Sequence, residues 1–164
     1  MIKIGILSDT HYGRPDSDFL ALTEHCFADC EVIIHAGDLT DISVLAAFAP
    51  KKVYGVHGNM CSASCRRQLP AHRSFTIQGY SFGLAHGNGL GHDIENQLIS
   101  LFPGADCLIY GHTHRPVCKR LGDILIINPG TFRSSGRYGA SGTYAVLELG
   151  DGLKAQILEV GSAT

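Results

Sequence analysis

The sequence lacks both an excess of charge of either sign and any long apolar run, and each absence excludes a class of protein. Its formal net charge is −2 over 164 residues, so it has no broad basic field of the kind that binds nucleic acid non-specifically. No apolar run approaches the roughly 20 residues that a membrane-spanning helix requires. The first residues lead directly into a strand-like run, without a signal sequence. We therefore expect a cytoplasmic protein that has no membrane partner and binds nucleic acid at most weakly.

Repeats, linkers and low-complexity segments are also missing from the sequence. A chain of this length is typical of one domain, and it buries roughly two-thirds of the surface that its unfolded form exposes. We therefore expect residues 1–164 to form a single domain with a hydrophobic core of its own.

The cysteines lack the spacing of a structural zinc site. Cys26 with Cys30, and Cys61 with Cys65, are separated by three residues, whereas zinc sites usually combine C-x2-C or C-x4-C pairs. A chain of this size with its own core does not need disulfides. We expect free thiols that pack as small buried hydrophobic residues.

Strands and helices alternate in the first third of the chain. Apolar runs bounded by turn residues predict strands at residues 2–7, 31–35 and 52–56. Apolar residues at helical spacing predict a helix over residues 17–29, and Asp41 is a suitable N-cap for a short helix over residues 41–48. Such alternation indicates a parallel sheet covered by helices.

The pattern then changes to hairpins. Paired strands joined at glycines are predicted at residues 73–78 with 80–85, 116–120 with 124–127, and 143–149 with 153–160. Between them, an amphipathic helix is predicted over residues 92–102 and a buried strand over residues 107–110. Residues 133–142 are rich in glycine and serine and are expected to form a surface loop. The chain is therefore expected to be an α/β protein with two mixed sheets between helices.

Side chains that ligate metals follow five of the predicted strands. In chain order they belong to Asp9, His11, Asp38, Asn59, His86, His112 and His114. Ligands of open α/β sheets bind outside the carboxyl ends of the strands, so these side chains are expected at one edge of the fold. Each short motif alone is explained by a turn or by a buried histidine. Because five separate strand ends carry such residues, the set as a whole predicts a metal site.

These motifs resemble those of a known enzyme family, the calcineurin-like metallophosphoesterases. The resemblance is carried by Asp9-x-His11, Gly37-Asp38, Gly58-Asn59, His86-Gly87 and Gly111-His112-Thr113-His114. The run Asn128-Pro129-Gly130-Thr131 is similar to an element of the small bacterial and archaeal phosphodiesterase branch of that family. The resemblance implies a metallophosphoesterase fold, a sandwich of two mixed β-sheets flanked by helices.

The resemblance also implies the ligands of two metal ions. One ion would be held by Asp9, His11, Asp38 and His114. The other would be held by Asp38, Asn59, His86 and His112, so Asp38 would bridge the two. Imidazole and carboxylate ligands without thiolate suit Mn, Fe, Co, Ni or Zn better than Ca or Mg, and Mn²⁺ is the ion we expect.

Such a centre suits the hydrolysis of a small phosphodiester. Two divalent ions outweigh the charge of two aspartates and a bridging hydroxide, so the site stays positive and attracts an anionic phosphate. The ions also lower the pKa of bound water and hold phosphoryl oxygens for in-line attack. Catalytic roles are accordingly implied for Asp38, Asn59 and His86, and Arg115, which follows His114 directly, is expected to bind substrate.

The sequence departs from the family pattern at one position. Many members carry a histidine after the Gly-Asn pair, where it is thought to protonate the leaving group, but this chain has Met60. A thioether cannot donate a proton. His57 is the predicted catalytic substitute, with His92 as the alternative.

Other functions on the same fold remain open from the sequence. The retromer complex uses a scaffold subunit of this fold with a degraded metal site, whereas every predicted ligand is intact here, which favours catalysis. A nuclease would need a capping or nucleic-acid-binding region for which a chain of 164 residues has no room. A phosphatase of nucleotides is a further alternative to a phosphodiesterase. Exposed edge strands also leave a homo-oligomer open.

Overall fold

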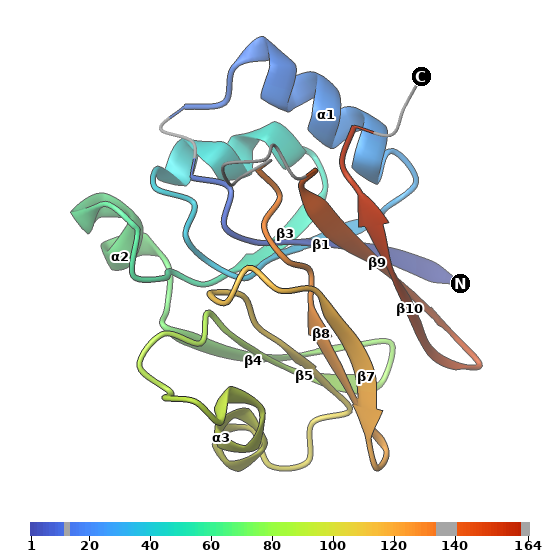
Figure 1. The fold of residues 1–164 in the computed structure, drawn as a ribbon. Helices are drawn as coiled ribbons and strands as arrows, with labels where there is room; N and C mark the ends of the chain where they lie inside the picture. Colours follow the sequence, from blue (N-terminus) through green and yellow to red (C-terminus); the bar gives the residue numbers. More distant parts are fainter. Residues whose placement is uncertain (12–13, 134–140, 162–164) are drawn as a thin grey trace.

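Two mixed sheets of five strands each form the body of the protein (Figure 1). The structure is a computed structural model that describes residues 1–11, 14–133 and 141–161. The strand order is β10-β9-β1-β2-β3 in the first sheet and β4-β5-β6-β8-β7 in the second. In each sheet three neighbouring strands are parallel, and each of the other two strands pairs antiparallel with its neighbours. The predicted sandwich of two mixed sheets is confirmed.

The strands have the following bounds. Those of the first sheet are β1 (Ile2–Leu7), β2 (Val32–His35), β3 (Lys52–Gly55), β9 (Thr143–Gly150) and β10 (Gly152–Glu159). Those of the second sheet are β4 (His72–Ile77), β5 (Tyr80–Ala85), β6 (Cys107–Ile109), β7 (Val117–Leu121) and β8 (Ile124–Asn128). The parallel strands β1, β2 and β3 end at one edge of the first sheet, which is on the left in Figure 1.

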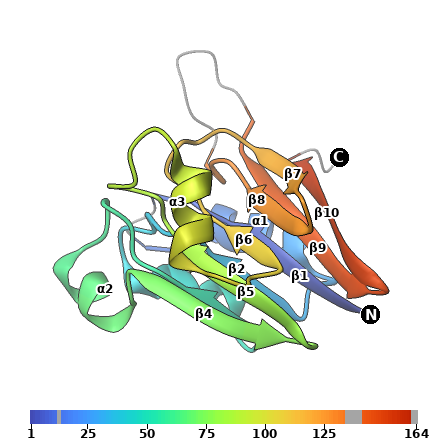
Figure 2. The same cartoon turned by 90° about the horizontal axis from the view of Figure 1, so that it is seen from below.

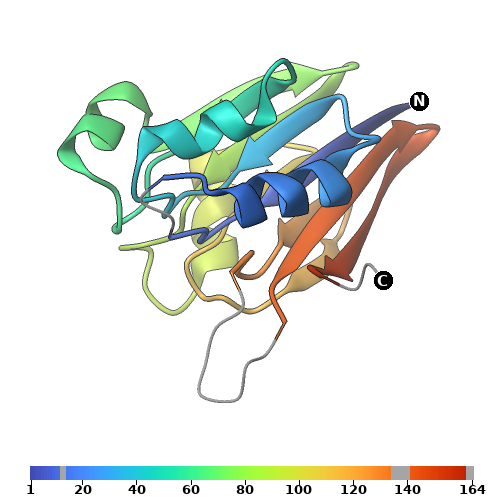
Figure 3. The same ribbon diagram turned by 90° about the horizontal axis from the view of Figure 1, so that it is seen from above.

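Helices cover the outer faces of both sheets. The first sheet is covered by α1 (Ser17–Phe27) and by the 3₁₀ helix η1 (Ile42–Phe48), as Figure 3 shows. The second sheet is covered by α3 (Ile94–Leu101), as Figure 2 shows. Side-chain caps fix where two of these helices begin, because Asp16 accepts the Phe19 N–H at 2.8 Å and Asp41 accepts the Ser43 N–H at 2.9 Å. The predicted N-cap role of Asp41 is confirmed.

The strands supply two hydrophobic layers because successive side chains point to opposite faces of a sheet. Ile6 and Ile34 lie between the two sheets together with Ile109 of the second sheet. Ile33 points to the other face, where it packs with Phe27 of α1. Strands buried on both faces read as continuous apolar runs, which is why the sequence identifies them clearly.

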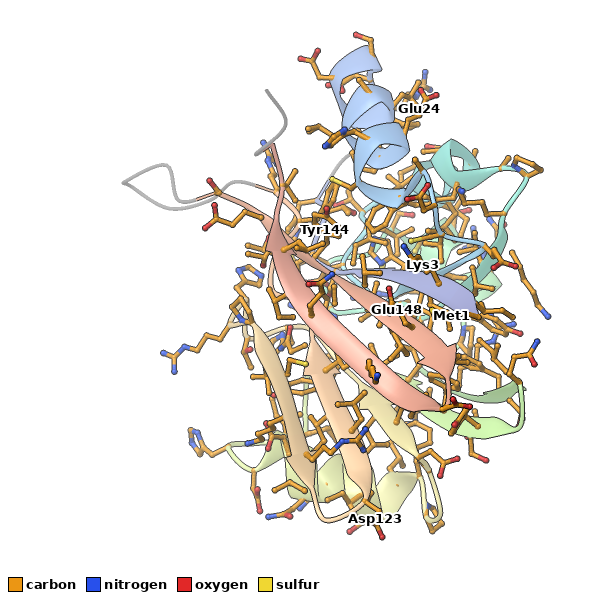
Figure 4. All side chains as sticks on the ribbon, turned by 90° about the vertical axis from the view of Figure 1, so that its right-hand side faces the viewer. Met1, Lys3, Glu24, Asp123, Tyr144 and Glu148 are labelled. Carbon is orange, nitrogen blue, oxygen red and sulfur yellow. The ribbon has the colours of Figure 1, made fainter. Side chains whose placement is uncertain are left out.

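An exposed ion pair joins two neighbouring strands of the first sheet. Lys3 on β1 lies opposite Glu148 on β9, and Figure 4 shows the two side chains near each other. Their Nζ and Oε1 atoms are 3.8 Å apart and both side chains are well exposed. Such a pair contributes about 0–1 kcal/mol to stability, so the sandwich depends on its core rather than on this ion pair.

The structure differs from the sequence predictions mainly at element ends. Helix α1 ends two residues before the predicted position 29, α3 is shorter at both ends than the predicted 92–102, and most strand ends differ by one residue. A short helix, α2 (Ala63–Gln68), was not predicted at all, because six residues are too few to show a helical period. The predicted surface loop over residues 133–142 falls largely outside the described residues.

Four of the six cysteines pack as buried hydrophobic residues, as predicted: Cys26, Cys30, Cys65 and Cys107. The prediction was wrong for Cys118, which is exposed, and for the half-buried Cys61. Within the described ranges, no helix has the length and apolar character needed to cross a membrane.

Candidate metal centre

The loops after β1 and β2 are held together by main-chain hydrogen bonds that continue beyond the strands. The Asp9 N–H donates to the Gly37 carbonyl at 2.9 Å, and the His11 N–H donates to the Asp38 carbonyl at 3.1 Å. The Gly111 N–H donates to the His86 carbonyl at 2.9 Å and joins the ends of β5 and β6 in the same way. The strand ends therefore form a rigid frame, and the side chains that follow them are directed to a common point.

The Asp9 carboxylate is completely buried and its two oxygens have different surroundings. Oδ2 accepts hydrogen bonds from Ser8 Oγ at 2.6 Å and from the His112 N–H at 3.2 Å. Oδ1 faces ring nitrogens of three histidines, with Nε2 distances of 3.2 Å for His114, 3.7 Å for His86 and 3.8 Å for His11. One oxygen is thus fixed by the protein while the other points into a cluster of nitrogens.

The two carboxylate oxygens of Asp38 also have different surroundings. Its Oδ1 accepts the Met60 N–H at 2.7 Å, and its Oδ2 lies 3.2 Å from His86 Nε2. Burial alone would raise the pKa of this carboxyl, but His86 and the Met60 amide outweigh that effect and lower the pKa below its ordinary value. The side chain is therefore an ionised carboxylate at neutral pH, and one of its oxygens is directed at His86.

His86 has a buried nitrogen without a hydrogen bond. Its Nδ1 lies 2.7 Å from the Ala36 carbonyl, and since a carbonyl can only accept, Nδ1 carries the proton. In the neutral ring Nε2 is then a free lone pair, and this atom makes no hydrogen bond within the described part of the chain. Desolvation lowers the pKa of His86, but the Asp38 and Asp9 carboxylates raise it, and the net shift is upward. A buried lone pair beside two carboxylates fits a cation ligand.

Two groups of donors, which share Asp9, meet the geometric requirement for holding a cation. Asp9, His11 and His114 form one group and Asp9, Asp38 and His86 form the other, with the ligand atoms of each group within 4.8 Å of one another. Asp9 therefore connects the two groups, whereas the resemblance gives the bridging role to Asp38. Carboxylate and imidazole donors in this arrangement suit a transition metal ion.

The backbone at the centre is strained. Five of the residues proposed as ligands have positive φ angles between 51° and 66°: Asp9, His11, Asp38, His112 and His114. Residues with side chains rarely adopt this conformation, which costs of order 1–3 kcal/mol each and persists only where the surrounding structure enforces it. Such concentrated strain at one point of the fold indicates that the positions of these side chains matter for function.

Two glycines permit the close approach of the ligands. A Cβ atom on Gly58 would lie 2.1 Å from Asp38 Oδ1, and one on Gly111 would lie 2.0 Å from Ser8 Oγ. No side chain fits at either position unless a carboxylate or its hydrogen-bond partner moves. These two glycines beside the predicted ligands are thus required by the close packing of the centre.

His35 is a buried residue that holds two loops of the centre together. No role was predicted for it from the sequence. The Gly37 N–H donates to its Nδ1 at 3.1 Å, so Nε2 carries the proton and donates to Thr10 Oγ1 at 3.1 Å. The buried ring therefore connects the loop after β1 with the loop after β2. Desolvation lowers the pKa of His35 to about 3, with a smaller contribution from the charge of His86.

We expect His35 to make the metal-free protein less stable in mild acid. Its folded pKa of about 3 lies below the unfolded value of about 6.5, so the unfolded chain binds the proton first as the pH falls between these values. The contribution is fully present above about pH 6.5 and is lost at about 1.4 kcal/mol per pH unit below it. In urea unfolding between pH 7 and 5, wild-type protein should lose about 2 kcal/mol more than His35→Gln. Equal losses in both proteins would contradict this assignment of the pKa.

Asn128 and Thr131, from the run that resembles the phosphodiesterase branch, lie against the same loops. Asn128 is buried, and its Nδ2 donates to the Gly111 carbonyl and to Thr113 Oγ1, both at 3.0 Å. Thr131 Oγ1 donates to the Asp9 carbonyl at 3.0 Å. These two residues position the segments that carry Asp9 and His112 instead of reaching into the centre themselves.

The remaining predicted site residues lie at the margin of the centre. The His112 ring is 5.3 Å from that of His86, centroid to centroid. Asn59 is exposed, and His57 is half-buried with Nδ1 3.4 Å from the Gly58 carbonyl. Arg115 is exposed and lines a groove next to His112. Among the described residues, none of these four belongs to the two donor groups.

Comparison with known proteins gives a family for this chain. A family model described as the calcineurin-like phosphoesterase superfamily domain matches residues 2–152. A probable metallophosphoesterase from Methanothermobacter thermautotrophicus is 38% identical over 133 residues, which cover 78% of this chain and 76% of that protein.

Solved structures with the same fold include an archaeal phosphodiesterase, described as novel and characterised structurally and functionally. It has a TM-score of 0.75 and 26% identity, and the match covers 97% of this chain and 100% of that one. Vacuolar protein sorting 29 from Cryptosporidium parvum matches with a TM-score of 0.75 and 19% identity, over 96% of this chain and 97% of that one. At that identity the second likeness shows the fold alone.

Proposed function

The chain belongs to the calcineurin-like phosphoesterase superfamily, and from this membership we propose that it is a phosphodiesterase dependent on two divalent metal ions. The observation that carries the proposal is the convergence of the Asp9 and Asp38 carboxylates on His86 Nε2, a buried nitrogen that makes no hydrogen bond with any described residue. The likeness to an archaeal phosphodiesterase supports a diester as substrate. We place its action in the cytoplasm.

The proposed ligands are those that the family resemblance implies. Asp9, His11, Asp38 and His114 would hold one ion, and Asp38, Asn59, His86 and His112 would hold the other. The short distances around Asp9 Oδ1 and Asp38 Oδ2 support the inner members of this set. Asn59 and His112 would complete it from the exposed side. Mn²⁺ is the proposed ion, with Fe, Co, Ni and Zn as alternatives.

When bound, such ions supply Lewis-acid activation of water and charge stabilisation at the phosphoryl group. The protein supplies orientation. The Ala36 carbonyl fixes the tautomer of His86, and the Met60 amide fixes the rotation of Asp38. Only two carboxylates enter the ligand set, so the occupied centre stays positive and attracts an anionic diester.

The test is hydrolysis of bis-p-nitrophenyl phosphate by protein first stripped of metal with EDTA. Activity should be absent after stripping and should return when Mn²⁺ is added. No activity with Mn²⁺, Fe²⁺, Co²⁺, Ni²⁺ or Zn²⁺ in protein shown to be folded would contradict the proposal. That result would favour a binding scaffold like the retromer subunit.

We predict a strong dependence of the rate on the leaving group. Met60 stands where many family members carry the proposed acid, its side chain is 56% exposed, and it has no proton to donate. General acid catalysis contributes about 10²–10⁴-fold, and alkoxide leaving groups need it most. Diesters of nitrophenols should therefore react faster than diesters of alkyl alcohols by at least that factor. The measurement is kcat against leaving-group pKa for a series of aryl and alkyl methyl phosphates.

His57 and His92 are the two residues proposed to replace that acid. A rate that does not change with leaving-group pKa would show that one of them protonates the leaving group. His57→Ala and His92→Ala would then identify it, because only the variant without the acid would regain the dependence.

A further inference from the structure

A groove opens beside the candidate metal centre and shares a wall with it. It encloses about 750 Å³, and His112 and Arg115 line it together with the segment from Gly87 to His92. Gly87, directly after His86, marks the junction, since a Cβ atom there would lie 3.5–3.7 Å from Ile94, Tyr110 and His112. A molecule bound at the centre can therefore extend into this groove without a break.

The groove is too large for a phosphate group alone. Pockets for small organic molecules enclose about 300–1,000 Å³, and this groove falls within that range. Gly89 and Gly91 border its open side, where a Cβ atom at either position would meet no described atom within 4 Å. The size indicates a substrate with an organic group about as large as a nucleoside.

The walls differ in chemistry from one side to the other. Ile94 and Val117 are apolar and pack against the cluster beneath α3. His92 and His112 present exposed imidazole rings, and Arg115 adds a positive charge at the rim. Planar rings on such side chains stack with heterocyclic bases, and a cation at the rim pairs with the diester phosphate.

The floor of the groove is rigid. The buried Tyr110 donates its hydroxyl hydrogen to Glu95 Oε1 at 3.0 Å, and Lys119 Nζ lies 2.7 Å from the second oxygen of the same carboxylate. These contacts connect the end of β6, the start of α3 and β7. Because its shape is held by three elements, the groove is preformed, which lowers the entropic cost of ordering a ligand.

We propose that this groove binds a nucleoside carried by the diester, so that the substrates are nucleoside phosphodiesters. The inference rests on the proposed phosphodiesterase function and adds the identity of the organic group. The phosphate would lie at the centre, and the base would lie between His92 and the apolar wall formed by Ile94 and Val117.

The test compares three diesters with the same leaving group: thymidine 5′-(p-nitrophenyl) phosphate, methyl p-nitrophenyl phosphate and p-nitrophenyl phosphorylcholine. Only the second ester group differs among them. The thymidine ester should have the highest kcat/KM, by at least about tenfold, which corresponds to the stacking of one base. Equal values for the thymidine and methyl esters, or a preference for the choline ester, would overturn the proposal while leaving the phosphodiesterase function in place.

A variant that fills the groove gives a second test. Tryptophan is favourable in β-strands, so Val117→Trp should leave β7 intact. The larger side chain should lower kcat/KM for the thymidine ester by about tenfold or more. The loss for the methyl ester should be clearly smaller, because a methyl group is too small to extend to the apolar wall. Leu121→Trp is the matched control, because Leu121 lies on the same strand, is exposed and does not line the groove. Equal losses for both esters in folded Val117→Trp would contradict the proposal.

A binding measurement tests the proposed nucleoside site independently of the proposed phosphodiesterase activity. Thymidine 5′-monophosphate should bind wild-type protein in calorimetry and should bind His92→Ala and Val117→Trp more weakly. Binding of this kind without any hydrolysis would preserve the nucleoside site and reject the phosphodiesterase. If the protein hydrolyses diesters but neither variant weakens nucleotide binding, the phosphodiesterase function stands and the nucleoside site is rejected.

Discussion

Replacing Asp38 by asparagine is expected to lower kcat/KM for bis-p-nitrophenyl phosphate by about 10³-fold or more. The asparagine has the same shape, so its carbonyl oxygen can still accept the Met60 N–H that Asp38 Oδ1 accepts at 2.7 Å. The negative charge beside His86 Nε2, 3.2 Å from Oδ2, is lost. A neutral amide is a poor bridge between two cations, so the variant should bind fewer ions than wild type.

Charge removal at a distant aspartate provides the control for this variant. Asp123 lies in the turn between β7 and β8, at the far end of the second sheet (Figure 4). Asp123→Asn should retain activity within about twofold of wild type, as surface substitutions usually do. Circular dichroism would establish that Asp38→Asn is folded. Wild-type activity in the folded Asp38→Asn variant would remove Asp38 from the proposed centre.

Metal binding is expected to raise the melting temperature by about 5–10 °C. Asp9 and Asp38, 0% and 3% exposed, share a buried site with His86 Nε2, which makes no hydrogen bond among the described residues, so the site is ready to take up a cation. An ion that binds only the folded state stabilises it by about 2.7 kcal/mol at 100 times its Kd. For a chain of this size each kcal/mol corresponds to roughly 2–4 °C. Differential scanning calorimetry of EDTA-treated protein with and without Mn²⁺ measures the shift.

The identity of the ion and of the site can be read from the same experiment. Mg²⁺ prefers oxygen ligands and water and should give a smaller shift than Mn²⁺ at equal concentration. Asp38→Asn should lose most of the shift, whereas Asp123→Asn should keep it. A full shift in Asp38→Asn would mean that the stabilising ion binds elsewhere.

Local pattern was sufficient to predict the strands and the residues at their ends. Ile33 and Ile34 face opposite hydrophobic layers, so β2 reads as an unbroken apolar run even in a single sequence. Asp38 lies three residues after the end of that strand, and the rule that parallel strands end at one edge brings it to the same edge as Asp9. The predicted element ends were less accurate, because helix ends depend on caps and on packing by distant residues.

Other features could not be predicted because they depend on residues far apart in the chain. Asp9 Oδ2 accepts a hydrogen bond from a residue 103 positions away, and His86 Nδ1 donates to one 50 positions away. The supporting role of His35 is of the same kind, since its ring joins two loops that only the folded sheet brings together.

The sequence by itself determined the α/β class with two mixed sheets and the chemical nature of the candidate centre, because apolar periodicity and donor residues are local properties of the chain. The packing of the sheets as a sandwich was implied by the family resemblance. The tertiary structure alone decided which oxygen of each carboxylate faces the histidines. It also decided that His86 Nε2 is left without a hydrogen bond from residues 1–11, 14–133 and 141–161, and that a groove extends from His112. These features depend on how side chains are oriented. That orientation is set by contacts between segments that are far apart in the chain and meet only in the folded protein.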